Sequence, residues 1–244
     1  MGKKLKLIGA ALAVVGLLFI AGGVYATTKV VSGEDSLQAF SEVQNVHVNY
    51  NDEGELVDRG STETAQDILR MLEDDWGYPV DMGELDPNDT LVNTGTEYMW
   101  QMAVITYHVM HGTYTIVVDE DVRNDDGEIT VSAGTYEFSP YQEFSEFDED
   151  GNLIPPAKGY WTDFNRMDPI EGPARSAAWT GTVHGLTGEL GVGAVTANTL
   201  ALSWGIVYLI FGLGLLNIAL GAGLYWAGMP EAAPAKKKAP AKKK

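Results

Sequence analysis

The stretch LIGAALAVVGLLFIAGGVYA, residues 7–26, decides the architecture of this chain. It contains 20 residues and no charged one, which matches the roughly 20 residues that an α-helix needs to cross about 30 Å of hydrocarbon. A second uncharged stretch, residues 199–229, lies near the other end of the chain. We therefore expect two transmembrane helices, at residues 7–26 and 199–229, with a separate domain between them.

Lysines flank both stretches on their terminal sides and predict which way the protein faces. Three precede the first stretch and six follow the second: Lys3, Lys4, Lys6, Lys236, Lys237, Lys238, Lys242, Lys243 and Lys244. Short flanks rich in lysine stay on the cytoplasmic side of a membrane. We expect a multi-pass plasma-membrane protein with two cytoplasmic segments, a basic start at residues 1–6 and a disordered Lys/Ala/Pro-rich tail at residues 230–244. An alternative is that the first stretch is a signal peptide cleaved after Ala26, because Val24-Tyr25-Ala26 has small residues at suitable spacing.

The segment between the two stretches, residues 27–198, is strongly acidic. It holds 7 basic and 33 acidic residues, a formal charge of −26 that the whole-chain value of −18 conceals. Such a domain repels nucleic acid and attracts cations or basic partners. We therefore expect no binding of nucleic acid. A salt-loving host would produce the same acidity on every exposed protein. The chain has no cysteine, so a hydrophobic core alone must hold this extracytoplasmic domain together.

Hydrophobic periodicity predicts an α+β fold for this domain. Apolar and polar residues alternate over residues 46–50, which predicts a strand, and residues 55–58 after a turn predict its hairpin partner. Apolar positions at helical spacing follow Ser61 and run to Trp76. The uncharged residues 98–111 predict a buried helix, residues 113–118 and 129–138 two antiparallel strands, and residues 174–190 a glycine-weakened helix.

Two histidines form the first candidate metal site. His108 and His111 have the i, i+3 spacing with which two imidazoles on one helical turn share a metal ion, and Met99, Met102 and Met110 would add soft ligands for copper. At about 100° per residue the methionines share one sector while His108 points away from it, so the two sets do not converge. Core methionines and a helix-end histidine explain the same residues.

The acidic turns form the second candidate. Asp148 and Asp150 occupy positions of a partial EF-hand pattern, and residues 49–54 give a similar partial match. Both patterns lack the carboxylate that closes a calcium loop, so ordinary hairpin turns are the competing interpretation. We expect at most weak divalent-cation binding there and no resident cofactor.

The second span carries a pattern of its own. Ala219, Gly223 and Ala227 place small residues at every fourth position, which lets two helices approach closely in lipid, and Asn217 near mid-span needs a hydrogen-bond partner. Gly9 and Ala13 offer a matching surface on the first span. The alternatives are pairing of the two spans, a homo-oligomer, or contact with another membrane protein.

Several segments together resemble a family of small actinobacterial two-span membrane proteins of unknown function: residues 37–60, 74–82, 85–108, 160–164 and 170–193. Members of that family are sometimes named automatically as aromatic ring-opening dioxygenases. An extradiol dioxygenase needs two histidines and a carboxylate on iron in a soluble catalytic domain, which two anchors around a small acidic domain do not resemble. The resemblance implies no site residues.

We therefore expect a non-enzymatic membrane protein that presents an acidic external domain in a structural or accessory role in the cell envelope. The chain carries no catalytic motif of the serine hydrolase, zinc protease or P-loop kind. An extracytoplasmic metal-handling protein is the alternative, and a membrane-tethered enzyme is the third.

Overall fold

The computed structural model describes residues 2–147, 153–154 and 164–229. These divide into two compact units, one made of residues up to Asp35 and from Leu200 onward, the other of Ser36–Thr199. Two long helices, α1 (Gly2–Gln44) and α6 (Gly181–Ala227), are apolar and long enough to cross a membrane. The expected class is confirmed at this level, because α+β elements lie between two long apolar helices.

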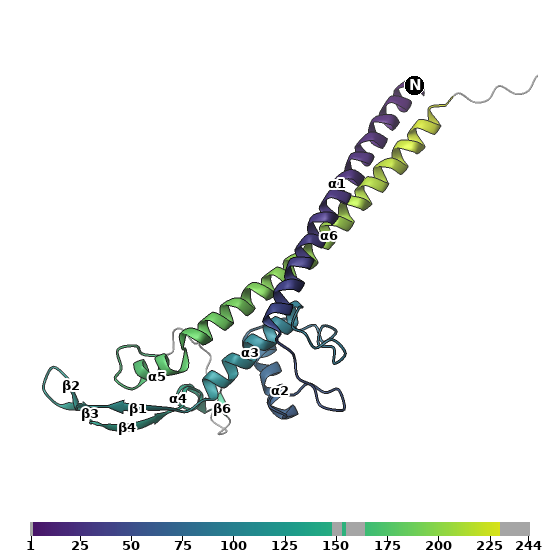
Figure 1. Cartoon of the computed structure of the whole chain (residues 1–244). Coiled ribbons are helices and arrows are strands. Elements are labelled where there is room, and N and C mark those ends of the chain that lie inside the picture. Colours follow the sequence, from purple (N-terminus) through teal and green to yellow (C-terminus); the bar gives the residue numbers. More distant parts are fainter. Residues whose placement is uncertain (1, 148–152, 155–163, 230–244) are drawn as a thin grey trace, which may run out of the picture. The chain divides into compact units, whose positions relative to one another are not determined.

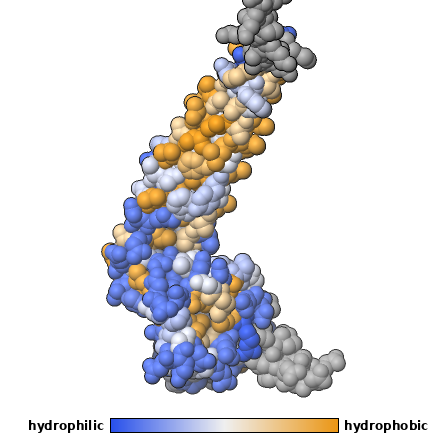
Figure 2. Space-filling model, turned by 90° about the vertical axis from the view of Figure 1, so that its right-hand side faces the viewer, coloured by the Kyte–Doolittle hydropathy of each residue, from blue (hydrophilic) through white to orange (hydrophobic). Residues whose placement is uncertain are grey.

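The first unit is an antiparallel pair formed by α1 and α6, which lie side by side (Figure 1). Buried positions recur every seventh residue on both sides of the pair: Gly9, Gly16, Gly23 and Val30 on α1, and Val207, Gly214, Gly221 and Gly228 along α6 and at its end. A seven-residue period keeps one seam of each helix against its partner through a left-handed supercoil. Most of the remaining side chains are apolar and exposed, and Figure 2 shows this hydrophobic surface over the pair.

Both long helices extend beyond the predicted spans. α1 continues from Ala26 to Gln44 without a break, and α6 already begins at Gly181. Three glycines in the first turns of α6 do not break it, although each costs about 1 kcal/mol relative to alanine. Leu190 and Ala194 in the same part of the helix are buried in the domain core, and this packing offsets the poor propensity.

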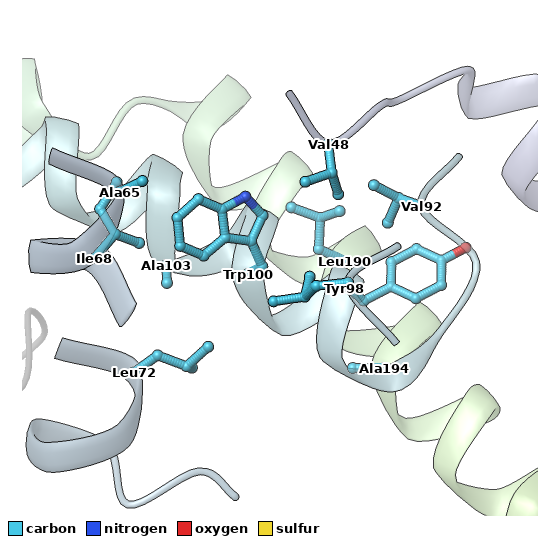
Figure 3. Packing of buried hydrophobic residues seen from close by; sticks show 11 residues of the cluster. Val48, Ala65, Ile68, Leu72, Val92, Tyr98, Trp100, Ala103, Leu190 and Ala194 are labelled. Carbon is cyan, nitrogen blue, oxygen red and sulfur yellow. The ribbon is translucent and has the colours of Figure 1, made fainter. Parts of the chain in front are cut away.

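Helix α3 (Gly95–His111) is the centre of the second unit and confirms the predicted buried helix. Trp100, Tyr98 and Ala103 are fully buried against Ile68, Leu72 and Val48, as Figure 3 shows. The helix begins with a capping box, in which Thr94 accepts from the Glu97 amide and the Glu97 carboxylate accepts from the Thr94 amide. This exchange satisfies backbone donors that every helix start leaves open.

The predicted helix after Ser61 is also present, in two parts. α2 (Thr62–Arg70) starts with Ser61 as its N-cap, and a π-helical turn, η1 (Met71–Asp75), continues it. The chain then leaves the helix at Gly77, whose φ of 64° lies in the region that glycine adopts without strain. Ile68 and Leu72 are carried on these two parts and fill the core beside α3.

The strands are shorter than the sequence predicted, and not all of them lie where it placed them. β1 (Tyr114–Val118) pairs antiparallel with β4 (Gly134–Phe138), whereas β2 (Val122–Arg123) pairs with β3 (Ile129–Val131), so the predicted strand 129–138 is two strands. The predicted strand at residues 46–50 makes only isolated bridges, to Leu91 and Leu56. The remaining elements are α4 (Pro140–Phe144), β5 (Glu146–Phe147), β6 (Leu153–Ile154) and α5 (Glu171–Ala178).

Two hairpin turns have the same construction. The Asn51 side-chain oxygen accepts from the Glu53 and Glu55 amides, and the Asn124 side-chain oxygen accepts from the Asp126 and Glu128 amides. Gly54 and Gly127 follow with φ of 79° and 83°. For residues 49–54 this geometry agrees with the hairpin interpretation, because the asparagine oxygen already accepts two backbone hydrogen bonds.

Candidate functional site

The last turn of α3 brings the two predicted histidines into contact with residues from two other segments, Asp58 and Tyr141. His108 Nε2 lies 2.8 Å from Asp58 Oδ2, and the side chain of Asp58 is 8% exposed. Asp58 is held by a two-way backbone bridge with Ser61, the N-cap of α2. The pair therefore connects the start of α2 with the end of α3.

His111 occupies a different environment, between two tyrosine rings. Its ring stacks on Tyr107 and on Tyr141, each with a centroid separation of 3.9 Å. Its Nδ1 lies 2.8 Å from the Tyr107 carbonyl oxygen. Burial lowers the pKa of His111 below the ordinary value of 6.5, because a desolvated imidazole favours its neutral form.

The contact with the Tyr107 carbonyl oxygen determines the tautomer of the neutral His111 ring. A carbonyl oxygen only accepts, so His111 Nδ1 carries a proton and Nε2 has the lone pair. His108 directs its Nε2 at Asp58 Oδ2, 2.8 Å away. Histidines whose other nitrogen donates to a carboxylate or a backbone carbonyl are the kind that bind metals in proteins.

The metal set predicted from the sequence is only partly assembled. His108 and His111 share one helix end, but Asp148 and Asp150 fall outside the described residues. Within the described parts of the chain, no three His, Cys, Asp or Glu residues group at metal-binding geometry. Met99 and Met102 pack against the core around Trp100, whereas Met110 belongs to the separate cluster around Phe138, so the methionines do not gather beside the histidines.

Charged groups lie around the histidine cluster. Burial raises the pKa of Tyr141, and the nearby carboxylate of Asp67 raises it further. Asp67 pairs with Arg70 on α2. Burial also raises the pKa of Asp75 in the π-helical turn, with Asp74 adding to the shift. π-Helical turns are frequent at functional sites. The histidine cluster, together with these charged groups, is therefore the best candidate polar site of the domain.

The amino-acid sequence points to the two histidines but not to their partners. Tyr107 lies four residues before His111, a helical spacing that the sequence shows. Asp58 and Tyr141 are 50 and 30 residues from the histidines they contact. No local pattern connects residues at such separations, so only the fold brings them together. The Thr94-x-x-Glu97 pattern is a local capping signal that could have located the start of α3.

The helix pair is the second candidate site, and its contact differs from the predicted one. A methyl group added at Gly221 would lie 2.6 Å from the Gly9 carbonyl oxygen, and one added at Gly16 would lie 2.6 Å from the Gly214 oxygen. Gly9 and Ala13 lie at this contact, as the sequence predicted. The backbones approach closely because glycine offers no side chain to separate them.

The small-residue stripe that the sequence predicted on α6 does not lie at the contact with α1. Ala219, Gly223 and Ala227 are exposed, and a methyl group at Gly223 would meet nothing within 4 Å. Asn217 satisfies its amide within its own helix, donating to the Leu213 carbonyl at 2.8 Å. The predicted four-residue spacing was wrong for the contact with α1. The residues of this segment that are buried against α1 are Gly214, Gly221 and Gly228, which are seven residues apart. A contact of the Ala219 stripe with another protein stays a prediction.

Polar and aromatic residues mark both ends of the helix pair. Lys6 Nζ lies 5.7 Å from the centre of the Tyr225 ring at one end. At the other end, Lys29 Nζ lies 5.7 Å from the Tyr25 ring, and Trp204 Nε1 donates to Glu34 Oε1 at 2.6 Å. Residues 6 and 25 are separated by 19 helical steps, or about 28 Å, which matches the hydrocarbon thickness of a bilayer.

Comparison with known proteins gives no relative. No protein-family model matches the chain, and no curated protein and no solved structure matches it. The functional assignment therefore rests on the geometry described above.

Proposed function

We propose that this protein is a non-enzymatic integral membrane protein that presents its acidic domain outside the cell in a structural or accessory role. The observation that carries the proposal is the glycine-packed helix pair, with apolar side chains on its outer surface. Exposed leucines and valines at this density are unfavourable in water and suited to lipid. Aromatic and charged residues at about 28 Å separation fit the two membrane interfaces.

The proposed orientation places both termini in the cytoplasm and residues 27–198 outside. Nine lysines at the terminal ends support it through the positive-inside rule. The formal charge of −26 on the external segment favours a basic protein or envelope partner over nucleic acid. We propose either a homo-oligomer or another membrane or envelope protein as the partner.

The orientation is tested with single cysteines, because the chain has none of its own. Asp125→Cys places a thiol on the exposed turn between β2 and β3, and Ala239→Cys places one in the C-terminal tail. A membrane-impermeant maleimide should label residue 125 in intact cells and residue 239 only after the cells are opened. Labelling of residue 239 in intact cells refutes the orientation.

The accessory role is tested by crosslinking in native membranes followed by affinity purification. A protein with this role yields the same partner, in a constant ratio, from repeated preparations. Replacing Asp125, Asp126 and Glu128 by their amides keeps the size of the side chains and removes three exposed charges. We expect lower partner recovery from that variant, and an absence of any reproducible partner contradicts the role.

Metal handling is the second candidate, favoured by one observation. His111 is fixed through Nδ1 and keeps the lone pair on Nε2, and His108 lies one helical turn away with its Nε2 against Asp58. Metal analysis of the full chain after purification tests this function. Stoichiometric copper, zinc or calcium that is lost in His111→Phe or Asp150→Asn would replace the accessory role with metal handling. Metal retained in both variants would exclude these two residues as ligands.

A further inference from the structure

A row of exposed apolar residues runs along α6 on a side that does not contact α1. From Val192 to Leu220 its positions advance by three and four residues in turn, over four heptads. Eight of the nine are large aliphatic residues, each between 38% and 67% exposed, and the ninth is an exposed threonine. We call this row the outer seam; it consists of Val192, Val195, Thr199, Leu202, Ile206, Leu209, Leu213, Leu216 and Leu220.

The outer seam and the contact with α1 lie on different sides of the helix. Ile206, Leu213 and Leu220 each directly precede a residue that is buried at the contact with α1. Successive residues are about 100° apart around a helix, so the outer seam points away from α1 by about this angle. At the other end of the seam, the two residues between Val192 and Val195 are buried in the domain core, which leaves the valines on the opposite face.

Lipid can cover only part of the outer seam. In the proposed topology Trp204, which donates to Glu34, marks the external end of the hydrocarbon region. Val195 and Val192 lie nine and twelve residues before Trp204, about 14 and 18 Å further out along the helix. These valines are 67% and 63% exposed. A continuous apolar row that extends beyond the reach of lipid chains is typical of a surface that binds protein.

The residue types of the outer seam fit a second copy of the same seam. Its spacing is that of the a and d positions of a coiled coil, and β-branched residues at a with leucine at d favour two parallel strands. No charged residue occurs between residues 190 and 229, so like charges do not oppose self-association. The β-branched a residues are Val192, Thr199 and Ile206, and the d leucines are Leu202, Leu209 and Leu216.

The polar group and the area of the outer seam are compatible with such an interface. The Thr199 hydroxyl donates to the Val195 carbonyl at 2.7 Å, so its hydrogen is already bonded within the helix. Eight aliphatic side chains, about half exposed, offer on the order of 500 Å² of apolar surface per copy. Two copies together would bury on the order of 1,000 Å², the size at which specific protein interfaces begin.

We propose that the outer seam packs against the same seam of a second copy as a parallel two-stranded coiled coil, so that the protein is a homodimer. The contact is isologous, about a two-fold axis along the membrane normal. The proposal rests on the proposed function and names its partner, since a parallel contact requires both copies to enter the membrane in the same direction.

Disulfide crosslinking of the full chain in vesicles tests the proposal. Val195→Cys, Leu202→Cys and Leu209→Cys each place one thiol at a d position of a chain that has no cysteine of its own. In a parallel coiled coil each d residue faces its counterpart, close enough for a disulfide after small adjustments. Mild oxidation should therefore convert each variant into a covalent dimer on a denaturing gel.

The matched controls are Tyr208→Cys and Leu215→Cys. Their side chains are 66% and 63% exposed but lie outside the outer seam, so they report chance encounters in the bilayer. The seam variants should give several-fold more covalent dimer than the controls. Equal crosslinking of the two groups, or none at the seam, overturns the proposal and leaves lipid as the occupant of this face.

Two further arms distinguish other occupants and other arrangements. A mixture of Val195→Cys and Leu216→Cys chains should not crosslink to one another more than each crosslinks to itself; preferential mixed dimers indicate an antiparallel contact and overturn the parallel one. The same seam variants are also oxidised in native membranes. Crosslinking there to a different protein, without the dimer in purified vesicles, overturns the homodimer in favour of another membrane partner.

Energy transfer provides a measurement that leaves the outer seam free of thiols. Donor- and acceptor-labelled copies of Asp125→Cys are diluted with increasing lipid, and Leu209→Ala is compared with Leu215→Ala in that background. Leu209→Ala should raise the dissociation constant of the dimer by about tenfold relative to Leu215→Ala, because each dimer loses two packed side chains. Equal dissociation constants contradict the outer seam as the interface.

Failure of the dimer is distinguishable from failure of the proposed function. The maleimide experiment on residues 125 and 239 reports the orientation of the chain whether or not it dimerises. Correct labelling without seam-specific crosslinking refutes the dimer and leaves the topology intact, whereas labelling of residue 239 in intact cells refutes the topology itself.

Discussion

The close contact between the two long helices makes a sharp prediction for the variant Gly221→Ala. The added methyl group would lie 2.6 Å from the Gly9 oxygen, 2.7 Å from the Ala13 nitrogen and 3.1 Å from the Ala13 Cα, whereas ordinary contact begins at 3.4 Å. All three are backbone atoms, so no side chain can rotate away. The helices must separate locally by about 0.8 Å, the difference between the first and last of these distances.

The expected loss of stability follows from that separation. A gap of 0.5–1 Å forfeits about a quarter to a half of the dispersion energy along the contact, and overpacking of this kind costs about 1–3 kcal/mol. The matched control is Gly223→Ala on the same helix, where a methyl group meets nothing within 4 Å. Both substitutions gain the same helix propensity, so the difference between them isolates the contact. We expect Gly221→Ala to be less stable than Gly223→Ala by about 2 kcal/mol.

The assay is reversible unfolding of the full chain in mixed micelles with increasing dodecyl sulfate, followed by far-ultraviolet circular dichroism. A second variant, Gly9→Ala, places its methyl group 2.5 Å from the Gly221 oxygen, in the same gap. The combined Gly9→Ala and Gly221→Ala variant should lose less than the two single losses together, because the first methyl group already opens the gap. Equal stabilities of Gly221→Ala and Gly223→Ala would refute the close backbone contact between α1 and α6 at Gly221.

Three other predictions concern the external domain. The variant His111→Phe keeps an aromatic ring between Tyr107 and Tyr141 but removes the group that titrates. Folding lowers the pKa of His111, so the contribution of the neutral imidazole to stability is complete above pH 6.5 and is lost as the pH falls below that value. The variant should show a shallower loss of stability just below pH 6.5 in thermal unfolding, and an unchanged slope contradicts the buried neutral histidine. Glu97→Ala leaves the amides of Asn93 and Thr94 without their acceptor and should cost about 2 kcal/mol by the same assay, whereas the exposed Glu143→Ala should change stability by less than about 0.5 kcal/mol. Gly127→Ala forces alanine to a φ of 83° and should lower the free energy of unfolding by about 1–2 kcal/mol. Ala133→Gly on the same hairpin is the control, since it shows the effect of exchanging alanine and glycine outside that turn. An unchanged stability of Gly127→Ala would contradict the turn geometry.

Long, strongly periodic segments were predictable from the sequence. The helix through Trp100 and the helix after Ser61 follow from local patterns, because an amphipathic or uninterrupted apolar run specifies its own hydrogen bonds. Strand extents were not predictable in the same way. Residues 46–50 alternate as a strand should, but their partners at residues 90–92 pair over only two or three residues, and a strand needs a partner.

The residues of the candidate sites were also only partly predictable from the sequence. His108 and His111 could be selected from their spacing, but Asp58 and Tyr141 could not, since their contacts span 50 and 30 residues. On α6 the sequence offers two small-residue registers, Ala219-Gly223-Ala227 and Gly214-Gly221-Gly228. Local pattern does not choose between them, because both would allow close approach.

The sequence by itself determined that the chain has two long apolar helices, nine lysines at its ends and a charge of −26 between them, since length, hydropathy and charge are additive properties of residues. Only the tertiary structure decided which glycines meet, that Gly2 contacts Gly228, and that Asp58 and the tyrosines surround the histidines. Those features depend on the register between segments far apart in the chain. Register is set by packing, which no single segment contains.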